Sequence, residues 1–325
     1  MPPGARIYVA GHRGLVGSAL VRRLRGAGYR ELILRTHAEL DLTDRAAVAA
    51  FFSAEQPEFV FLAAAKVGGI LANDTYPADF IRVNLQIQTN TIEQAHLHGA
   101  KRLLFLGSTC IYPRDCPQPI KEDYLLTGPL ETTNSAYALA KIAGIEMCRS
   151  YNQQYGTKYL AAMPTNLYGP GDNYDLQASH VLPALIRKFP EARVTGAPEV
   201  TVWGTGRPLR EFLYSDDMAD ACVFVMNLEA GRFDGFLRSQ RYPLINVGLG
   251  SDVSIADLAR LVAEVEGYTG RIVFDTSKPD GTLRKLTDPS RLFGLGWRPR
   301  TELKQGIALA RADYIERVAA SQHAA

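Results

Sequence analysis

The sequence has few of the cysteines that form disulfide bonds in small secreted proteins or bind metal ions. Its 325 residues include only four cysteines: Cys110, Cys116, Cys148 and Cys222. Four cysteines in a chain of this length do not form a disulfide framework, and none stands in a CxxC pair or a Cys/His cluster with zinc spacing. We therefore expect reduced thiols, and we expect no metal site.

Long apolar runs and a strong charge imbalance are also missing. No stretch approaches the ~20 apolar residues that span a bilayer, and the opening segment MPPGARIYVAGHRG has no signal-peptide core. The net charge of +2 is too small to indicate a nucleic acid or a membrane surface as partner. We therefore expect a soluble, cytoplasmic protein with neither kind of partner.

Strand and helix patterns alternate through the first half of the chain. Short apolar runs that predict strands lie at 5–10, 31–36, 59–65, 102–108 and 158–170. Between them, helical spacing of apolar residues covers 18–29, 45–55, 83–100 and 135–156. This alternation predicts an α/β fold with a doubly wound, Rossmann-type parallel sheet that is covered on both faces.

The character of the chain changes after Pro170. Residues 171–211 are rich in glycine, proline and polar side chains, and helical patterns return at 216–231 and 254–268. We expect two domains that are interleaved in sequence. The cofactor domain would comprise 1–170 with returning segments at about 212–245 and 284–297. The smaller substrate domain would comprise 171–211, about 246–283 and 298–325.

A glycine-rich turn, GHRGLVG, follows the first predicted strand and opens the first predicted helix. Gly11, Gly14 and Gly17 would allow a tight turn, close approach of the backbone to a pyrophosphate and close packing of the helix. In this context the motif predicts dinucleotide binding. Its GxxGxxG spacing resembles that of the extended short-chain dehydrogenase/reductase family.

The end of the second predicted strand indicates which dinucleotide is bound. An acidic residue there would hold the ribose 2′-hydroxyl of NAD, whereas arginine accepts the 2′-phosphate of NADP. The sequence has Arg35 at this point and a further cation, Arg13, inside the glycine loop. These two arginines favour NADP(H). The segment that begins at Asp41 and Leu42 resembles the part of the family that contacts adenine.

The predicted helix at 135–156 carries Tyr137 and Lys141 in a YxxxK motif. Residues four apart lie on the same face of a helix, so the lysine can sit beside the phenol, and a neighbouring cation favours the phenolate. Ser108 follows the fourth predicted strand. Together with the glycine loop, these residues resemble the Ser-Tyr-Lys triad of short-chain reductases, in which the serine binds the reacting carbonyl.

Cys110, two residues after Ser108, is open to two interpretations. By itself it is more simply a packing residue, because free cysteines are often buried. Longer motifs favour chemistry: AGHRGLVGSAL, GSTCIYP, YALAKIAGIE, MPTNLYGPGDNY, SHVLPALIRKF, VWGTGRPLREFLYSDDMA and FDTSKPDGTLRKLTD. From about residue 5 to 310 the chain resembles the GDP-L-fucose synthase family. These enzymes epimerise GDP-4-keto-6-deoxy-D-mannose at C3 and C5 and reduce it at C4 with NADPH.

The resemblance implies the roles of individual residues. Cys110 would be the base and His180 the acid of epimerisation, and one departure is His37, where the family often has a second arginine. The cofactor-contacting residues would be Gly11, His12, Arg13, Gly14, Leu15, Val16, Gly17, Arg35, Asp41, Leu42, Leu106, Gly107, Ser108, Thr109, Tyr137, Lys141, Pro164, Thr165, Asn166, Leu167 and His180. The nucleotide sugar would be bound by Lys188, Trp203, Arg210 and Asp280. A homodimer formed through the helices at 84–98 and around Tyr137 is also implied.

Two other functions remain open. A nucleotide-sugar 4-epimerase of the same family would retain its cofactor and would not need Cys110 and His180. A non-catalytic NADP-binding redox sensor is a possibility from another class, but the intact Ser108, Tyr137 and Lys141 argue against it.

Overall fold

A computed structural model of the protein describes residues 1–176, 179–278 and 280–323. Five residues of the predicted substrate domain lie outside these ranges: 177–178, 279 and 324–325. No helix among the described residues has the length and apolar character needed to cross a membrane.

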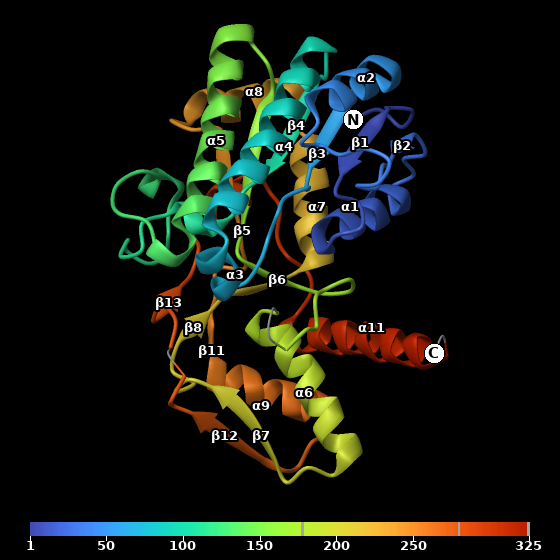
Figure 1. The fold of residues 1–325 in the computed structure, drawn as a ribbon. Helices are drawn as coiled ribbons and strands as arrows, with labels where there is room; N and C mark the ends of the chain where they lie inside the picture. The colour runs from blue at the N-terminus through green and yellow to red at the C-terminus, as the bar shows by residue number, and fades with distance from the viewer. Residues whose placement is uncertain (177–178, 279, 324–325) are drawn as a thin grey trace.

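A six-stranded parallel sheet forms the upper part of the molecule in Figure 1. Its strand order is β10-β5-β4-β3-β1-β2, which confirms the predicted doubly wound fold class. Along the chain, the strand order reverses direction at β1, and ligands bind at such a switch point in open α/β sheets. The six strands are β1 Ile7–Ala10, β2 Leu32–Ile33, β3 Phe59–Leu62, β4 Arg102–Leu106, β5 Tyr159–Pro164 and β10 Leu244–Val247.

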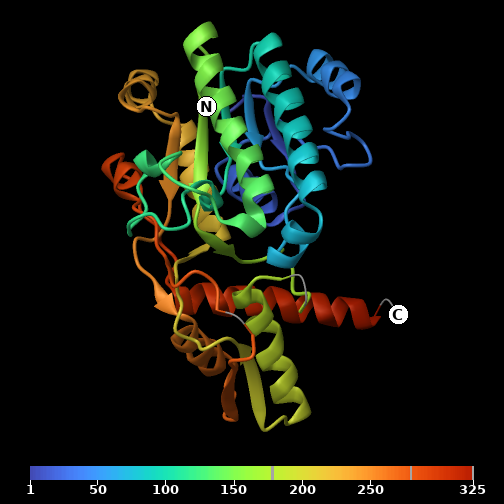
Figure 2. The ribbon, with the colours of Figure 1, turned by 60° about the vertical axis from the view of Figure 1, so that its left-hand side comes forward.

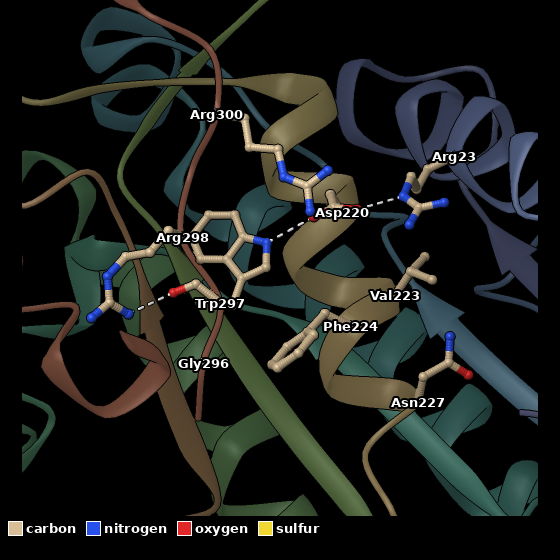
Figure 3. Close-up of a pocket in the computed structure, with 9 residues that line it drawn as sticks. All are labelled: Arg23, Asp220, Val223, Phe224, Asn227, Gly296, Trp297, Arg298 and Arg300. Atoms are coloured by element: carbon tan, nitrogen blue, oxygen red, sulfur yellow. Dashed lines mark hydrogen bonds and ion pairs between the residues drawn. The ribbon is translucent and has the colours of Figure 1, made fainter. Parts of the chain in front are cut away.

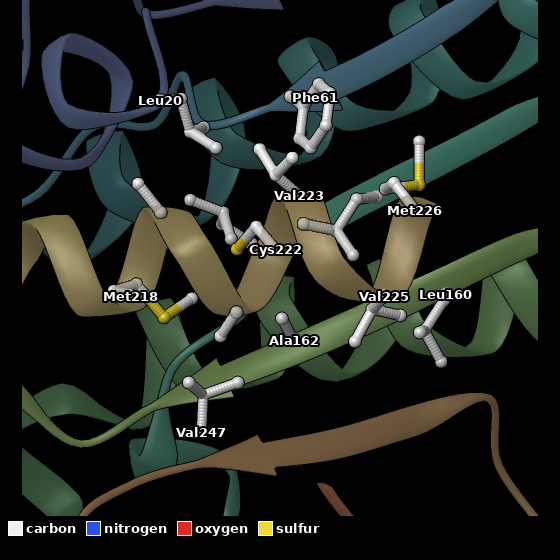
Figure 4. Close-up of a cluster of buried hydrophobic side chains, with 14 of the residues drawn as sticks. Leu20, Phe61, Leu160, Ala162, Met218, Cys222, Val223, Val225, Met226 and Val247 are labelled. Atoms are coloured by element: carbon white, nitrogen blue, oxygen red, sulfur yellow. The ribbon is translucent and has the colours of Figure 1, made fainter. Parts of the chain in front are cut away.

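Helices cover both faces of this sheet (Figures 1 and 2). One face carries α1 Leu15–Gly26 and α7 Ser215–Met226, and the other carries α2 Arg45–Glu55, α4 Pro77–Leu97 and α5 Ser135–Tyr155. Figure 4 shows the apolar side chains of α7, among them Met218 and Cys222, facing Phe61 and Ala162 of the sheet. The short helix α3 Ile70–Thr75 precedes α4.

The lower part of the molecule has its own core and smaller sheets. Strand β7 pairs with β12, and β8 lies between β11 and β13. Helices α6, α9 and α11 pack around a third apolar cluster. The elements are α6 Val181–Thr195, β7 Glu199–Trp203, β8 Leu209–Arg210, β11 Val253–Ser254, α9 Ile255–Glu266, β12 Arg271–Asp275, β13 Arg284–Lys285 and α11 Leu303–His323.

The remaining elements connect the two parts. Strands β6 Asn166–Tyr168 and β9 Phe212–Tyr214 pair with each other. The carboxylate of Glu211 is fully buried beside them and accepts bonds from the backbone N–H groups of Leu249 (2.6 Å), Gly250 (2.7 Å) and Thr287 (2.9 Å). A buried carboxylate with this many donors is well satisfied, so it fixes the segment after β13 beside β8 and β9.

Several predicted boundaries were wrong. The strand predicted at 31–36 is reduced to β2, because the carbonyl of Leu34 accepts a hydrogen bond from the Arg35 side chain rather than from a neighbouring strand. The helix predicted at 216–231 ends at Met226, and Glu229 caps a new helix, α8 Ala230–Ser239, with bonds from two backbone N–H groups. Helices α6, α11 and the short α10 Ser290–Gly294 were not predicted.

Candidate active site

The glycine loop follows β1 and is closed by contacts that leave no room for side chains. Gly11 has φ of +80°, and a Cβ added there would lie 2.7 Å from the backbone nitrogen of Ala64. A Cβ on Gly17 would lie 2.0 Å from the carbonyl oxygen of Gly11. Helix α1 begins at Leu15 without a side-chain cap, so its first backbone N–H groups remain available to an anion. The loop therefore fits a dinucleotide pyrophosphate.

His12 and Arg13 extend this loop. The Nδ1 atom of His12 is buried and has no hydrogen-bond partner among the described residues. Desolvation and then the charge of Arg13 lower the pKa of His12, so its ring is neutral at neutral pH. Arg13 is exposed, and the described residues provide no ion-pair partner for it. The loop thus presents one free cation.

The other cation, Arg35, is already engaged. Its guanidinium forms an ion pair with Glu55 and lies 5.7 Å from the centroid of the Phe51 ring. Nearby, Glu39 accepts bonds from the backbone nitrogen (2.7 Å) and hydroxyl (2.8 Å) of Thr36, which lower the pKa of its carboxyl group. The exposed His37 lies with Nδ1 3.9 Å from Asp41. This edge of the site therefore contains charges of both signs.

Lys141 joins helix α5 to the end of strand β4. Only 3% of Lys141 is exposed, and its Nζ donates a 2.8 Å hydrogen bond to the carbonyl of Leu106. The same nitrogen lies 5.7 Å from the centroid of the Tyr137 ring. Because Leu106 ends β4 and Ser108 follows it, this bond brings the three residues of the predicted triad to one region.

The protonation of the triad differs from the expectation. Burial, and then the charge of Cys110, raise the pKa of Tyr137 above its usual range, so the side chain is a neutral phenol. Burial also lowers the pKa of Lys141 to about 8, partly opposed by Cys110. Nζ of Lys141 is directed to a carbonyl and both groups are desolvated, so the phenolate that the spacing favours is not the resting form of Tyr137.

Cys110 lies in a single turn of 3₁₀ helix, Thr109–Ile111, that Ser108 caps. Its backbone nitrogen donates a long 3.4 Å hydrogen bond to the Ser108 hydroxyl, and 8% of the residue is exposed. Burial raises the pKa of the thiol, whereas the charges of Lys285 and Lys141 and a bond from Ser108 lower it. Desolvation is the largest of these effects, so the neutral thiol is the resting form of Cys110.

His180 is the N-cap residue of α6, and part of its surface is exposed to solvent. Surrounding protein nevertheless desolvates the imidazole, and this effect, followed by the charge of Lys285, lowers its pKa. The effect of Lys285 on both His180 and Cys110 indicates that the two predicted proton carriers border one region. Lys285 was not singled out from the sequence; its only signal was its place in the PDGTLRKL stretch.

The predicted substrate residues form two pairs in the lower part. Lys188 donates a 2.9 Å bond to the carbonyl of Thr201, and its Nζ lies 5.8 Å from the ring centroid of Trp203, which is 59% exposed. Asp280 accepts bonds from the backbone nitrogen (2.9 Å) and hydroxyl (2.6 Å) of Thr205. Its charge acts on Arg210, whose pKa is lowered mainly by burial.

The other predicted residues lie at strand ends. Gly107 and Thr109 flank Ser108, while Pro164 ends β5. Thr165 and Asn166 both bond to the carbonyl of Glu211, at 3.4 and 2.8 Å. Gly14 is the N-cap residue of α1, and Val16 lies in the first turn of that helix. Leu42 lies in the segment before α2, and Leu167 lies in β6.

One hollow lies away from this site. It has a volume of about 400 Å³ and is formed by α1, α7 and the segment around Trp297 (Figure 3). Asp220 lines this hollow. It accepts a 2.9 Å hydrogen bond from the Trp297 indole and forms an ion pair with Arg23. None of the predicted site residues lines this hollow.

Comparisons with known proteins agree with the fold and with the family resemblance. GDP-L-fucose synthase 1 of Arabidopsis thaliana is 57% identical, with 97% of this chain and 94% of that protein covered. GDP-L-fucose synthase of Escherichia coli (strain K12) is 53% identical, covering 96% and 97%. A solved GDP-D-glycero-L-gluco-heptose synthase of Campylobacter jejuni, crystallised in the presence of NADPH, has a TM-score of 0.90 at 39% identity, covering 97% and 99%.

The resemblance predicted from the motifs is thereby confirmed. The model of the NAD dependent epimerase/dehydratase family matches residues 7–234, a span that includes the glycine loop, Ser108, Cys110, Tyr137, Lys141 and His180. The chain therefore belongs to the NAD dependent epimerase/dehydratase family.

Proposed function

We propose that this enzyme converts GDP-4-keto-6-deoxy-D-mannose to GDP-L-fucose by epimerisation at C3 and C5 and NADPH-dependent reduction at C4. The observation that carries the proposal is the arrangement at the end of β4. There Ser108 caps the turn that holds the Cys110 thiol, and Lys141 ties the Tyr137 helix to the same strand end. Relatives at more than half identity are named for this synthesis.

Epimerisation needs a base and an acid on opposite faces of the sugar. The 4-ketone acidifies the neighbouring C–H groups, so Cys110 would remove a proton and His180 would return one. In the absence of substrate the pKa of Cys110 is raised and the pKa of His180 is lowered. The pair therefore rests as thiol and neutral imidazole, and the reactive form requires transfer of a proton between these two sites.

Reduction needs a proton at the C4 oxygen. NADPH supplies the hydride when it is bound. The raised pKa of Tyr137 keeps the phenol protonated, which suits a group that donates its proton as the alkoxide forms. Ser108 would hydrogen-bond the ketone oxygen, and the ammonium of Lys141 would stabilise the phenolate that remains.

The cofactor is NADP(H). The glycine contacts and the uncapped start of α1 support pyrophosphate binding at Gly11–Gly17. Arg13 is the free cation for the 2′-phosphate, and Arg35 would join it by leaving or sharing Glu55. The remaining contacts stay as inferred from the sequence.

The nucleotide sugar would lie between the sheet and the lower part of the molecule. Exposed Trp203, with Lys188 and Lys278 close to its ring, offers a surface for a flat or sugar ring, and Arg210 offers donors to the diphosphate. Asp280 is bonded to Thr205 and would shape this loop. In this proposal the domain around the large sheet binds the cofactor, and the domain below it binds the substrate.

We also propose a homodimer in the cytoplasm. Exposed apolar side chains on the packed helices α4 and α5, including Leu97, Leu139 and Tyr155, support association through these helices. The need for a free thiol at Cys110 supports a reducing compartment. Light scattering of the purified protein would measure the mass in solution.

The test is to incubate the enzyme with NADPH and GDP-4-keto-6-deoxymannose and identify the sugar produced. The proposal expects GDP-L-fucose and one NADPH oxidised per product. Inversion at C4 of a GDP-sugar that carries a C4 hydroxyl, with no net NADPH consumption and no reduction of the 4-ketone, would instead identify a 4-epimerase. Reduction without inversion at C3 and C5 would identify a simple C4 reductase.

A further inference from the structure

Lys285 is a half-buried cation that the proposed chemistry has not yet used. It ends the two-residue strand β13, which pairs in parallel with β8 so that Lys285 lies opposite Arg210. Register partners in neighbouring strands place their side chains on the same face of a sheet. The ammonium and the guanidinium therefore face the same side.

The backbone beyond Lys285 is fastened to the loop that continues from the Cys110 turn. The backbone nitrogen of Leu286 donates a 2.8 Å bond to Oε1 of Gln118, and the nitrogen of Ile120 donates a 2.8 Å bond to the Leu286 carbonyl. Thr287 bonds to the buried Glu211 through both its nitrogen (2.9 Å) and its hydroxyl (2.7 Å). Lys285 is thus held between β8 and the loop that follows Cys110.

No acidic side chain neutralises Lys285 at contact distance. Within the described ranges it forms neither an ion pair nor a side-chain hydrogen bond, and burial lowers its pKa. The titratable groups whose charges act on it are, from the largest effect, Cys110, Arg210, Cys116 and Glu131.

The same ammonium acts on both proposed proton carriers. Of the charged groups that influence Cys110, Lys285 has a larger effect than Lys141, and both favour the thiolate. Lys285 also disfavours the protonated form of His180. A cation at this place makes the base easier to form and makes the protonated imidazole a stronger acid.

We propose that Lys285 is an electrostatic positioning residue for epimerisation, acting through Cys110 and His180 from its fixed place between β8 and the Cys110 loop. This inference rests on the proposed function. In the step, a C–H bond beside the ketone breaks, its proton goes to the Cys110 sulfur, and its electron pair forms the enolate. Protonation of the same carbon by His180 on the other face forms the new C–H bond, so no oxidant or reductant is consumed.

The test measures Cys110 without any substrate. Wild type, Lys285→Met and Lys285→Arg are alkylated with iodoacetamide between pH 6.5 and 9, and the rate at Cys110 is followed by peptide mass spectrometry. Loss of this ammonium is expected to raise the thiol pKa, because a nearby cation favours the thiolate. The lower thiolate fraction is partly offset by the higher nucleophilicity of the thiolate, so the alkylation rate below the midpoint should fall roughly threefold.

The matched control is Arg284→Met. Arg284 is adjacent on β13, points to the opposite face by strand alternation and forms a 2.5 Å ion pair with Asp252. Its loss removes the same charge from the same strand but should leave the Cys110 rate unchanged. Lys285→Arg should retain the wild-type rate, and Lys285→Gln replaces Lys285→Met if the latter loses NADPH binding or its circular dichroism spectrum.

Substrate experiments separate the possible roles. Lys285→Met should slow solvent-deuterium exchange at C3 and C5 at saturating substrate by a similar factor, with little change in KM. An unchanged alkylation profile with a raised KM alone would overturn the inference and make Lys285 a ligand of the diphosphate beside Arg210. If Cys110→Ser exchanges both protons at the wild-type rate, the proposed function itself fails, whatever the alkylation shows.

Discussion

The glycine loop and the region around β8 and β13 are assembled in opposite ways. In the loop, Gly11 and Gly17 lie close in sequence, and their backbone contacts leave no space for a Cβ. Around β8 and β13, the groups Cys110, Arg210 and Lys285 come from separate segments and act on one another mainly through charge. Shape therefore dominates the proposed cofactor end, and electrostatics in a desolvated space dominates the proposed substrate end.

The largest expected effect comes from breaking the shape of the loop. In Gly17→Ala the new Cβ would meet the Gly11 carbonyl oxygen at 2.0 Å, so α1 or the loop must move. We expect loss of NADPH binding and destabilisation by roughly 3 kcal/mol, measured by fluorescence titration and by urea unfolding. Gly26→Ala is the control, because a Cβ there meets nothing within 4 Å in the same helix. Equal behaviour of the two variants would contradict the packing account.

Tyr137→Phe addresses the chemistry between the two regions. It removes the proton donor but keeps the ring, which packs edge-on against Phe80 at 6.2 Å between centroids. NADPH oxidation should fall ~10²–10⁴-fold, whereas NADPH binding and deuterium exchange at C3 and C5 should persist. Near-normal NADPH oxidation would mean that another group protonates the C4 oxygen.

Lys141→Met tests whether desolvation controls the charges. The folded protein lowers the pKa of Lys141 from 10.5 to about 8, so the unfolded chain binds more protons between these values. Stability of the wild type should consequently rise with pH through this window. The variant should gain up to roughly 3 kcal/mol relative to the wild type at pH 7, less about 1 kcal/mol for the lost bond to Leu106.

The relative stability of Lys141→Met should disappear as the pH rises above 10.5, where the wild-type lysine is neutral in both states. Urea unfolding at several pH values measures this difference, with the exposed Lys121→Met as the control. A difference between Lys141→Met and wild type that stays constant with pH would show that the ammonium is not desolvated in the folded protein.

The smallest expected effect concerns the edge of the proposed cofactor site around Arg35, where charges of both signs lie. Arg35→Ala should weaken NADPH about tenfold, while NADH affinity changes little, because only NADPH carries the 2′-phosphate. Arg6→Ala is the matched control. Arg6 also forms an ion pair with Glu55, at 2.9 Å, but it lies immediately before β1. Equal losses for both cofactors in Arg35→Ala would remove Arg35 from 2′-phosphate recognition.

Local patterns were sufficient to predict the fold class, five of the six strands of the large sheet and the position of the glycine loop, whereas β10 was not predicted. Apolar runs and the GHRGLVG turn depend on neighbours in sequence, so they could be interpreted without coordinates. Helix α6 was missed because its segment contains Pro190 and lies after a polar, glycine-rich stretch. The division into two domains, the roles of the site residues and the dimer remain predictions.

The directions of the pKa shifts could not be predicted from the motifs. The spacing of Tyr137 and Lys141 indicated a cation beside a phenol, but it could not show that Nζ bonds to Leu106 or that both groups are desolvated. Lys285 likewise reaches the Cys110 region through strand pairing with β8, a contact between residues far apart in sequence. Charge effects depend on burial and distance, and a motif records neither.

The central claim is that Cys110 is the base of an epimerase that shares its site with the Tyr137 reductase. The most direct measurement is deuterium incorporation at C3 and C5 of GDP-4-keto-6-deoxymannose in heavy water with cofactor omitted, followed by NMR. Cys110→Ser preserves the shape but replaces the thiol with a far weaker acid, so incorporation should be nearly abolished. Reduction of the unepimerised ketone should continue in a parallel assay that contains NADPH. Tyr137→Phe should show the reverse. Wild-type incorporation at both carbons in Cys110→Ser would contradict the account and leave Cys110 as a packing residue.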